Sequence, residues 1–225
     1  WTDTNQTFVH PKLDLGAQYL LANPVGALYG VLFLQNFVYN STSYSIEDFD
    51  YLNTMKYADS IASDVLNANL EVDEFRARGG KLLQYHGLAD ELIPSGDSIL
   101  WHTKVKERLG PQDLSIDDWY RLFLVPGMGH CGSSSSKAPW FFAAALHQQA
   151  AVGVVYSTPG FMDPGHDITL AMMNWVEKGI APTEIIATRY KNDTVASGVE
   201  RQRPVCMYPN SAIYDGEGEV NDVES

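Results

Sequence analysis

Two polar residues, Asp90 and His130, have the side-chain types that proton transfer to and from a serine requires. Asp90 ends the segment His86-Gly-Leu-Ala-Asp, and His130 ends the segment Gly127-Met-Gly-His. A histidine that takes a proton from a serine hydroxyl becomes cationic, and a carboxylate on its other ring nitrogen fixes the tautomer and stabilises that charge. We therefore predict that Asp90 orients His130 and that His130 acts as general base and then general acid.

The elements before these residues explain why the two side chains should meet. Residues 81–85 and 119–125 are apolar runs typical of buried strands, and residues 95–109 between them have a polar start, late basic residues and Gly110-Pro111 as a stop signal. A strand, helix, strand unit of this kind has parallel strands. In an open parallel sheet, loops beyond the carboxyl ends of the strands bind ligands, and both residues lie in such loops. The predicted fold class is α/β.

Flanking regions give weaker signals. Residues 45–75 have apolar residues at helical spacing, and residues 167–178 form an amphipathic helical pattern closed by Gly179. Residues 1–45 mix aromatics with Gly and Asn without a sustained period, which we interpret as part of a lid.

The nucleophile of such a triad is missing from the sequence. No Gly-x-Ser-x-Gly occurs, and residues 133–136, all serine, follow the histidine in a polar loop unlike a strand-to-helix elbow. The order acid before histidine agrees with α/β-hydrolases, in which serine comes first. The serine is therefore expected upstream of this chain. His86 is expected only to close its strand, and Glu91 to be a solvated loop charge.

Composition narrows the partners and the compartment. The net charge of −13 argues against nucleic acid or an anionic membrane as partner. The chain begins at Trp1 without a leader, so we expect a processed piece of a longer precursor. Three Asn-x-Ser/Thr sequons, at Asn5, Asn40 and Asn192, favour a secreted, extracellular glycoprotein. No metal-binding motif occurs, so we expect no catalytic metal and no cofactor in this chain.

Five motifs together resemble the fungal tannase and feruloyl esterase family, over about residues 75–218. They are Gly79-Gly-Lys, His86-Gly-Leu-Ala-Asp-Glu-Leu-Ile-Pro, Gly127-Met-Gly-His-Cys, Trp175-Val-Glu-Lys-Gly-Ile-Ala-Pro and Arg203-Pro-Val-Cys-Met-Tyr-Pro. The resemblance implies an α/β-hydrolase fold with a lid, Asp90 as triad acid and His130 as triad base. We assign residues 1–55 to the lid and residues 56–225 to the carboxyl-terminal part of the catalytic domain.

The resemblance also implies partners for this chain. Some fungal tannases are cut into two chains that stay associated, so this chain resembles the C-terminal subunit of one, with the N-terminal subunit carrying the serine. In the family, a disulfide joins the cysteine after the histidine to a cysteine just before the serine, which would tie Cys131 to the missing segment. The sequence alone leaves open a simple Cys131 to Cys206 bond. A structural calcium is expected, if anywhere, in the missing lid segment, and further dimerisation is left open.

The implied function is a secreted serine esterase for aromatic acid esters, with gallate esters of tannins favoured. The alternatives are a feruloyl esterase acting on hydroxycinnamate esters and a non-catalytic subunit on a hydrolase scaffold. Residues 133–165 depart from the usual family pattern and contain the aromatic run Trp140-Phe-Phe. This run would serve either as a wall of the substrate pocket or as internal packing, and we favour packing.

Overall fold

The boundary between the two folded units of the chain falls at residues 70 and 71 in the computed structural model. The structure describes residues 24–66, 70–90, 93–110, 116–130, 132, 134, 138–143, 158–219 and 221. Helix α3 (Tyr51–Leu66) runs across the boundary that the sequence suggested between residues 55 and 56. Within the described ranges, no helix combines the length and apolar character needed to span a bilayer. The assignment of the first unit to a lid stays a prediction.

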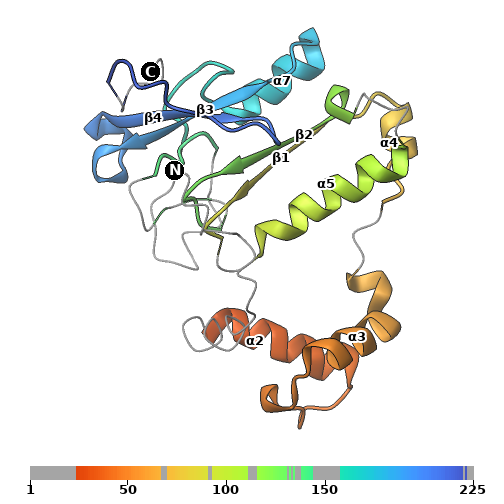
Figure 1. Ribbon diagram of the computed structural model, residues 1–225. Helices are drawn as coiled ribbons and strands as arrows, with labels where there is room; N and C mark the ends of the chain where they lie inside the picture. The colour runs from red at the N-terminus through yellow and green to blue at the C-terminus, as the bar shows by residue number, and fades with distance from the viewer. Residues whose placement is uncertain are drawn as a thin grey trace. The chain divides into compact units, whose positions relative to one another are not determined.

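The first unit is helical. Helix α2 (Pro24–Phe33) continues into the π-helix η1 (Leu34–Val38), and the short η2 (Ile46–Asp48) precedes α3 (Figure 1). A small core forms around Leu34, Val38 and Ala58. Helix α2 was not predicted, because nearly all of its ten residues are apolar or Gly and such a helix shows no one-sided period.

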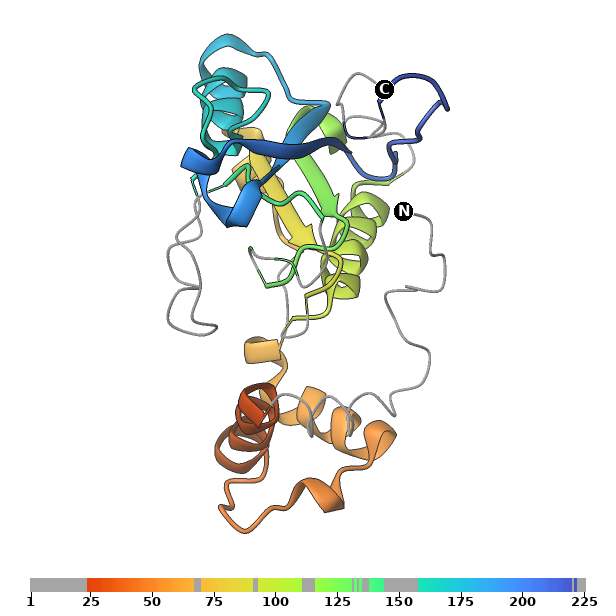
Figure 2. The same cartoon turned by 90° about the vertical axis from the view of Figure 1, so that its left-hand side faces the viewer.

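The second unit contains the strand, helix, strand motif expected from the sequence. Strands β1 (Leu82–Gly87) and β2 (Tyr120–Val125) pair in parallel, with Leu82 opposite Tyr120 and Gly87 opposite Val125. Helix α5 (Ser95–Leu109) connects them and lies along one side of the pair, as Figures 1 and 2 both show. The short α4 (Asp73–Ala77) precedes β1, and η3 (Ile116–Asp118) precedes β2. The predicted parallel pairing is confirmed.

An antiparallel pair that the sequence did not predict covers the other side. Strands β3 (Glu184–Tyr190) and β4 (Val199–Cys206) are joined through the 3-10 turns η5 (Lys191–Asp193) and η6 (Val195–Ser197). Just after β4, the backbone N–H of Tyr208 donates to the carbonyl of Leu122 on β2 at 2.8 Å. Helix α7 (Ile168–Lys178) was predicted and precedes β3. The charged residues Glu200, Arg201 and Arg203 lie in β4 and hide its strand pattern in the sequence.

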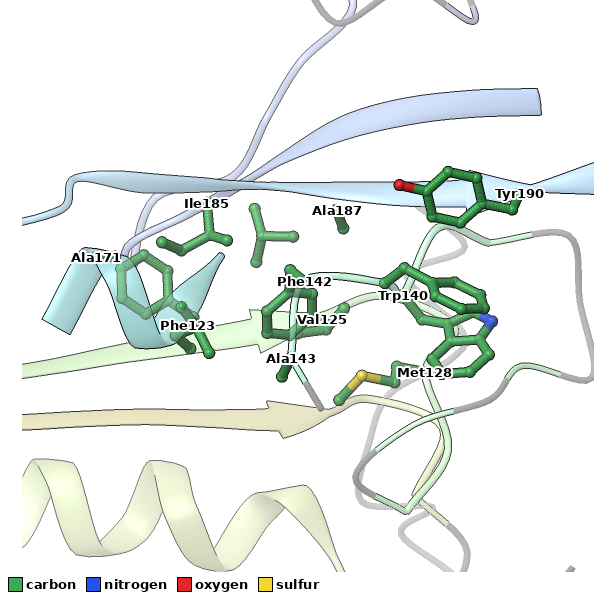
Figure 3. Close-up of a cluster of buried hydrophobic side chains, with 13 residues drawn as sticks. Phe123, Val125, Met128, Trp140, Phe142, Ala143, Ala171, Ile185, Ala187 and Tyr190 are labelled. Atoms are coloured by element: carbon green, nitrogen blue, oxygen red, sulfur yellow. The ribbon is translucent and has the colours of Figure 1, made fainter. Parts of the chain in front are cut away.

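The main core lies between β2, β3 and α7 (Figure 3). Phe123 from β2, Ala171 from α7 and Ile185 from β3 are all at most 2% exposed. The aromatic run enters this core, because Trp140 is 3% exposed and Phe141 and Phe142 are 1% exposed. Packing is therefore the role of these three side chains, whereas residues 144–157 lie outside the described part of the chain.

The face that α5 turns to the strands is unusually polar. Its buried residues are Ser95, Ser98, His102 and Val105. Leu100 of the same helix is 50% exposed. Two hydrogen-bonding side chains of β1, those of Gln84 and His86, contact the hydroxyl of Ser98 on this face.

Candidate active site

The loops that follow β1 and β2 are joined by backbone hydrogen bonds. The N–H of Leu88 donates to the carbonyl of Val125, and the N–H of Ala89 donates to that of Met128, both at 2.9 Å. Gly87 permits this approach, because a side chain there would collide with the carbonyl oxygens of Met128 and Gly129. Parallel strands that end side by side thus deliver their two loops to one place.

Asp90 and His130 meet at this place. His130 Nδ1 lies 2.9 Å from Asp90 Oδ2. Because a carboxylate only accepts, the shared proton lies on Nδ1 and is donated to Asp90. The Asp90 side chain is 3% exposed, whereas that of His130 is 31% exposed. The buried carboxylate therefore orients a ring whose other nitrogen, Nε2, is the one available for proton exchange.

The Asp90 carboxylate is held by backbone as well. Oδ1 accepts the N–H of Ile93 at 2.9 Å, and the N–H of Asp90 itself donates to the carbonyl of Gly87 at 3.2 Å. Such a turn, closed by the aspartate side chain, fixes the carboxylate before any partner binds. This arrangement supplies the acid and base half of nucleophilic catalysis, and it lacks the nucleophile itself within the described residues.

His86 belongs to the same cluster, which the sequence analysis did not anticipate. Its Nε2 lies 3.2 Å from Asp90 Oδ2, and its Nδ1 lies 2.7 Å from Ser98 Oγ. The hydrogen bond to Asp90 raises the pKa of His86, although burial acts in the opposite direction. The available signal was strand parity, since residues 84 and 86 share one face of β1 and that face points to α5.

The two cysteines differ in what the structure describes. Cys131 lies outside the described residues, as does Glu91. Cys206, at the end of β4, is a free thiol of intermediate exposure, so the intrachain bond that the sequence left open is not formed here. Burial, with a smaller effect of Glu184, raises the pKa of this thiol. Cys206 is therefore a poor nucleophile near neutral pH.

The predicted glycosylation sites that can be located are accessible. Asn40 and Asn192 are both exposed and both have positive φ angles, of 46° and 54°. Asn5 lies outside the described residues. Among the residues that the structure describes, no group of three or more His, Cys, Asp or Glu side chains could hold a metal ion.

Comparison with known proteins identifies relatives along almost the whole chain. The family model described as tannase and feruloyl esterase matches residues 2–225. A probable feruloyl esterase B-2 of Aspergillus terreus is 30% identical over 97% of this chain and 40% of its own length. An uncharacterised esterase of Xanthomonas campestris is 35% identical over 73% of this chain and 28% of its own length. The chain therefore spans less than half the length of these curated relatives.

Solved structures show the same fold. An esterase from Aspergillus oryzae matches with a TM-score of 0.67 and 30% identity, over 85% of this chain and 36% of that one. Feruloyl esterase B from the same organism matches with a TM-score of 0.72 at 24% identity, over 87% and 36% of the two chains. The expected α/β-hydrolase fold class is confirmed. From its sequence and its fold, the chain belongs to the tannase and feruloyl esterase family.

Proposed function

We propose that this chain supplies the acid and the base of a serine esterase that hydrolyses aromatic acid esters. The observation that carries the proposal is the 2.9 Å hydrogen bond from His130 Nδ1 to the buried Asp90 carboxylate, at the carboxyl ends of adjacent parallel strands. His130 Nε2 would take the serine proton during attack on the ester carbonyl and return it to the leaving alcohol. Water would then release the acid by the same route.

The nucleophile is proposed to lie on an upstream segment of the same precursor, either continuous with this chain or cut from it. The chain has no Gly-x-Ser-x-Gly and covers 40% of the A. terreus relative, which leaves ample length for a serine segment. We further propose that Cys131 bonds to a cysteine beside that serine. The bond would hold the serine and histidine loops together and, by closing a long loop, would contribute about 4 to 5 kcal/mol.

The substrate is proposed to be a gallate or a hydroxycinnamate ester. Gallate is the preference from the sequence motifs, and the names of the relatives support both, since they include feruloyl esterase B and a tannin acyl hydrolase from Aspergillus niger. Initial rates of the assembled protein on methyl gallate and methyl ferulate distinguish the two. A higher kcat/KM on methyl ferulate would reverse the gallate preference.

The triad assignment is tested in the assembled protein. Asp90→Asn and His130→Ala are each expected to lower kcat on the order of 10⁴-fold while the protein stays folded, because each removes a member of the proton relay. His166→Gln is the matched control, since His166 also pairs with a carboxylate, Asp163, but lies outside the cluster. Near-normal turnover by either triad variant would exclude the assignment.

A non-catalytic subunit on the same scaffold is the competing proposal. Its distinguishing feature would be a partner segment without a cysteine-serine pair at a strand-to-helix turn. Sequencing the segment that copurifies with this chain therefore separates the two. We also propose that the protein is secreted and that it is glycosylated at Asn5, Asn40 and Asn192. We further propose a structural calcium in the upstream lid segment, and further dimerisation. They are checked by intact mass, metal analysis and light scattering of the assembled protein.

A further inference from the structure

The triad carboxylate has a second histidine on the same oxygen. Asp90 Oδ2 lies 2.9 Å from His130 Nδ1 and 3.2 Å from His86 Nε2. The His86 side chain is 11% exposed, so this contact is shielded from solvent. His86 therefore shares the atom on which the orientation of His130 depends.

The surroundings of His86 fix its tautomer. Its Nε2 lies 3.0 Å from the carbonyl oxygen of Ile93 as well as near Asp90. Because a carbonyl and a carboxylate can only accept, Nε2 carries a proton. In the neutral ring Nδ1 is then an acceptor, and the hydroxyl of Ser98, 2.7 Å away, is its donor.

A chain of donors continues behind Ser98. The amide Nε2 of Gln84 donates to Ser98 Oγ at 2.8 Å, and the hydroxyl of Tyr120 donates to Gln84 Oε1 at 2.6 Å. Burial raises the pKa of Tyr120, so this phenol keeps its proton and remains a donor. Every hydrogen bond from Tyr120 to His86 thus runs in one direction, toward Asp90.

The two-residue period of β1 explains how this series of hydrogen bonds forms. Gln84 and His86 are two residues apart on β1, so both side chains point to α5, whose Ser98 is 7% exposed. Burying such groups is costly unless each is hydrogen-bonded, and apolar residues would close the same interface more simply. A role in holding the Asp90 carboxylate would explain why buried polar side chains form a series of hydrogen bonds that ends on it.

We propose that His86 is a positioning residue of the triad: through Nε2 it holds the Asp90 carboxylate in the orientation that His130 needs, and Ser98 selects the tautomer that allows this. The inference rests on the proposed function for its catalytic consequence. Without His86, Oδ2 loses the donor at 3.2 Å, and the carboxylate is freer to turn about its side-chain bond. The negative charge of Asp90 then interacts with His130 and no longer with His86, so Asp90 stabilises a protonated His130 more strongly.

The charged and titratable groups around His86 within the described residues are few. Asp90 lies in the loop after β1, Asp97 lies in the first turn of α5, and His130 lies across the shared carboxylate. Both carboxylates favour a protonated His86. Replacing His86 by a residue that neither donates nor ionises therefore removes a hydrogen bond from Asp90 and, at pH values low enough to protonate His86, a neighbouring positive charge.

The test compares His86→Phe and His86→Gln in the assembled enzyme. The amide of Gln can still donate to Asp90, whereas Phe keeps only the ring. For His86→Phe we expect kcat to fall about 10- to 100-fold from misplacement of the carboxylate. We also expect little change in KM and an acid limb of the kcat/KM profile moved to higher pH. His86→Gln should recover most of kcat, and His166→Gln is the control.

A purely structural role would reduce the amount of folded enzyme without moving the acid limb. The proposal is overturned if the limb stays in place in folded His86→Phe, or if His86→Gln is as impaired as His86→Phe. If His86→Phe does not fold, Ser98→Ala provides the test, because it removes only the donor that selects the tautomer of His86. An unchanged acid limb and an unchanged kcat in Ser98→Ala would overturn the proposal equally.

A second readout does not depend on turnover. In the proton NMR spectrum, the Nδ1–H of His130 should give a downfield signal that is absent from His130→Ala. We expect His86→Phe to broaden or shift that signal and His86→Gln to keep it. An unchanged signal in His86→Phe contradicts the positioning role, whereas a changed signal in a protein without esterase activity contradicts only the proposed function.

Discussion

At the scale of single residues, the site depends on how many groups converge on one buried carboxylate. Asp90 is bonded by His130 and His86 on one oxygen and by the N–H of Ile93 on the other. A carboxylate removed from water is stable as an anion only when donors satisfy it, and these three do so. The orientation of His130 is therefore fixed before substrate binds.

Gly87 allows the close approach of the two loops that carry Asp90 and His130. Gly87→Ala would press a methyl group against the carbonyl oxygens of Met128 and Gly129 and force the loops apart. We expect a loss of stability of about 1 to 3 kcal/mol and a lower kcat, measured by urea unfolding and by ester hydrolysis. Gly30→Ala, on the open side of α2, is the control and should be neutral or gain up to about 1 kcal/mol. An active, equally stable Gly87→Ala would show that the close approach is unimportant.

His102 should give the stability a distinct pH dependence. It is 4% exposed on α5, and burial lowers its pKa below the usual 6.5. Below pH 6.5 the unfolded imidazole binds a proton that the folded one resists, so this residue makes stability fall as pH falls. His102→Phe, which suits the neighbouring rings of Tyr120 and Tyr208, should lessen that loss.

The measurement is the urea midpoint of wild type and His102→Phe at pH 5 and pH 7.5. His86 acts in the opposite sense: its raised pKa gives a contribution that is present below pH 6.5 and lost as pH rises through the raised value. The difference between variant and wild type isolates His102. The same difference at both pH values would refute the assignment.

At the scale of elements, the two-residue period of the strands gives their two faces different contacts. On β1, Gln84 and His86 face α5 and take part in the hydrogen-bond chain, whereas Tyr85 faces the other way and packs edge-on against Phe142. On β2, Phe123 joins the core beside α7. One face of β1 therefore packs into the apolar core, whereas the side chains of Gln84 and His86 on its other face take part in the hydrogen-bond chain.

Helix α7 is held at its start by Asp167. The carboxylate accepts the N–H groups of Thr169 at 2.8 Å and Leu170 at 3.2 Å. Asp167→Ala should cost about 1 kcal/mol of unfolding free energy, because two backbone donors lose their partner. Asp167→Asn keeps an acceptor and should lower the unfolding free energy by only a few tenths of a kcal/mol. Equal losses in chemical denaturation would show that the carboxylate charge, and not the cap, matters.

At the scale of the whole molecule, the chain spans only part of the length of its relatives. It matches 40% of the A. terreus relative and 36% of the A. oryzae esterase, yet its Asp90 and His130 are already paired. The elements of this chain thus bring together the two residues proposed as acid and base. The proposed serine segment must then dock against a site that is largely formed.

This division predicts how a serine-directed phosphonate labels the protein. The chain expressed alone should neither hydrolyse methyl gallate nor take up the label, because no serine of the required type is present. Coexpression with the upstream segment should restore both, with the label on the upstream chain. Label on this chain would place the nucleophile here and overturn the two-part arrangement. The coexpressed His130→Ala variant is the control and should label slowly.

The sequence by itself determined the strand, helix, strand unit, its parallel pairing and the meeting of Asp90 with His130. These follow from local signals: apolar runs, stop residues and the rule that parallel strands end at one edge. It could not determine α2, whose apolar residues lack a period, or the pairing of β3 with β4, because charged residues mask the pattern of β4. Tertiary structure alone placed His86 between Asp90 and Ser98, because Ser98 is twelve residues away on another element. Whether a polar side chain is exposed to solvent or hydrogen-bonded to another element depends on which element packs over it. The local spacing of residues does not encode that packing.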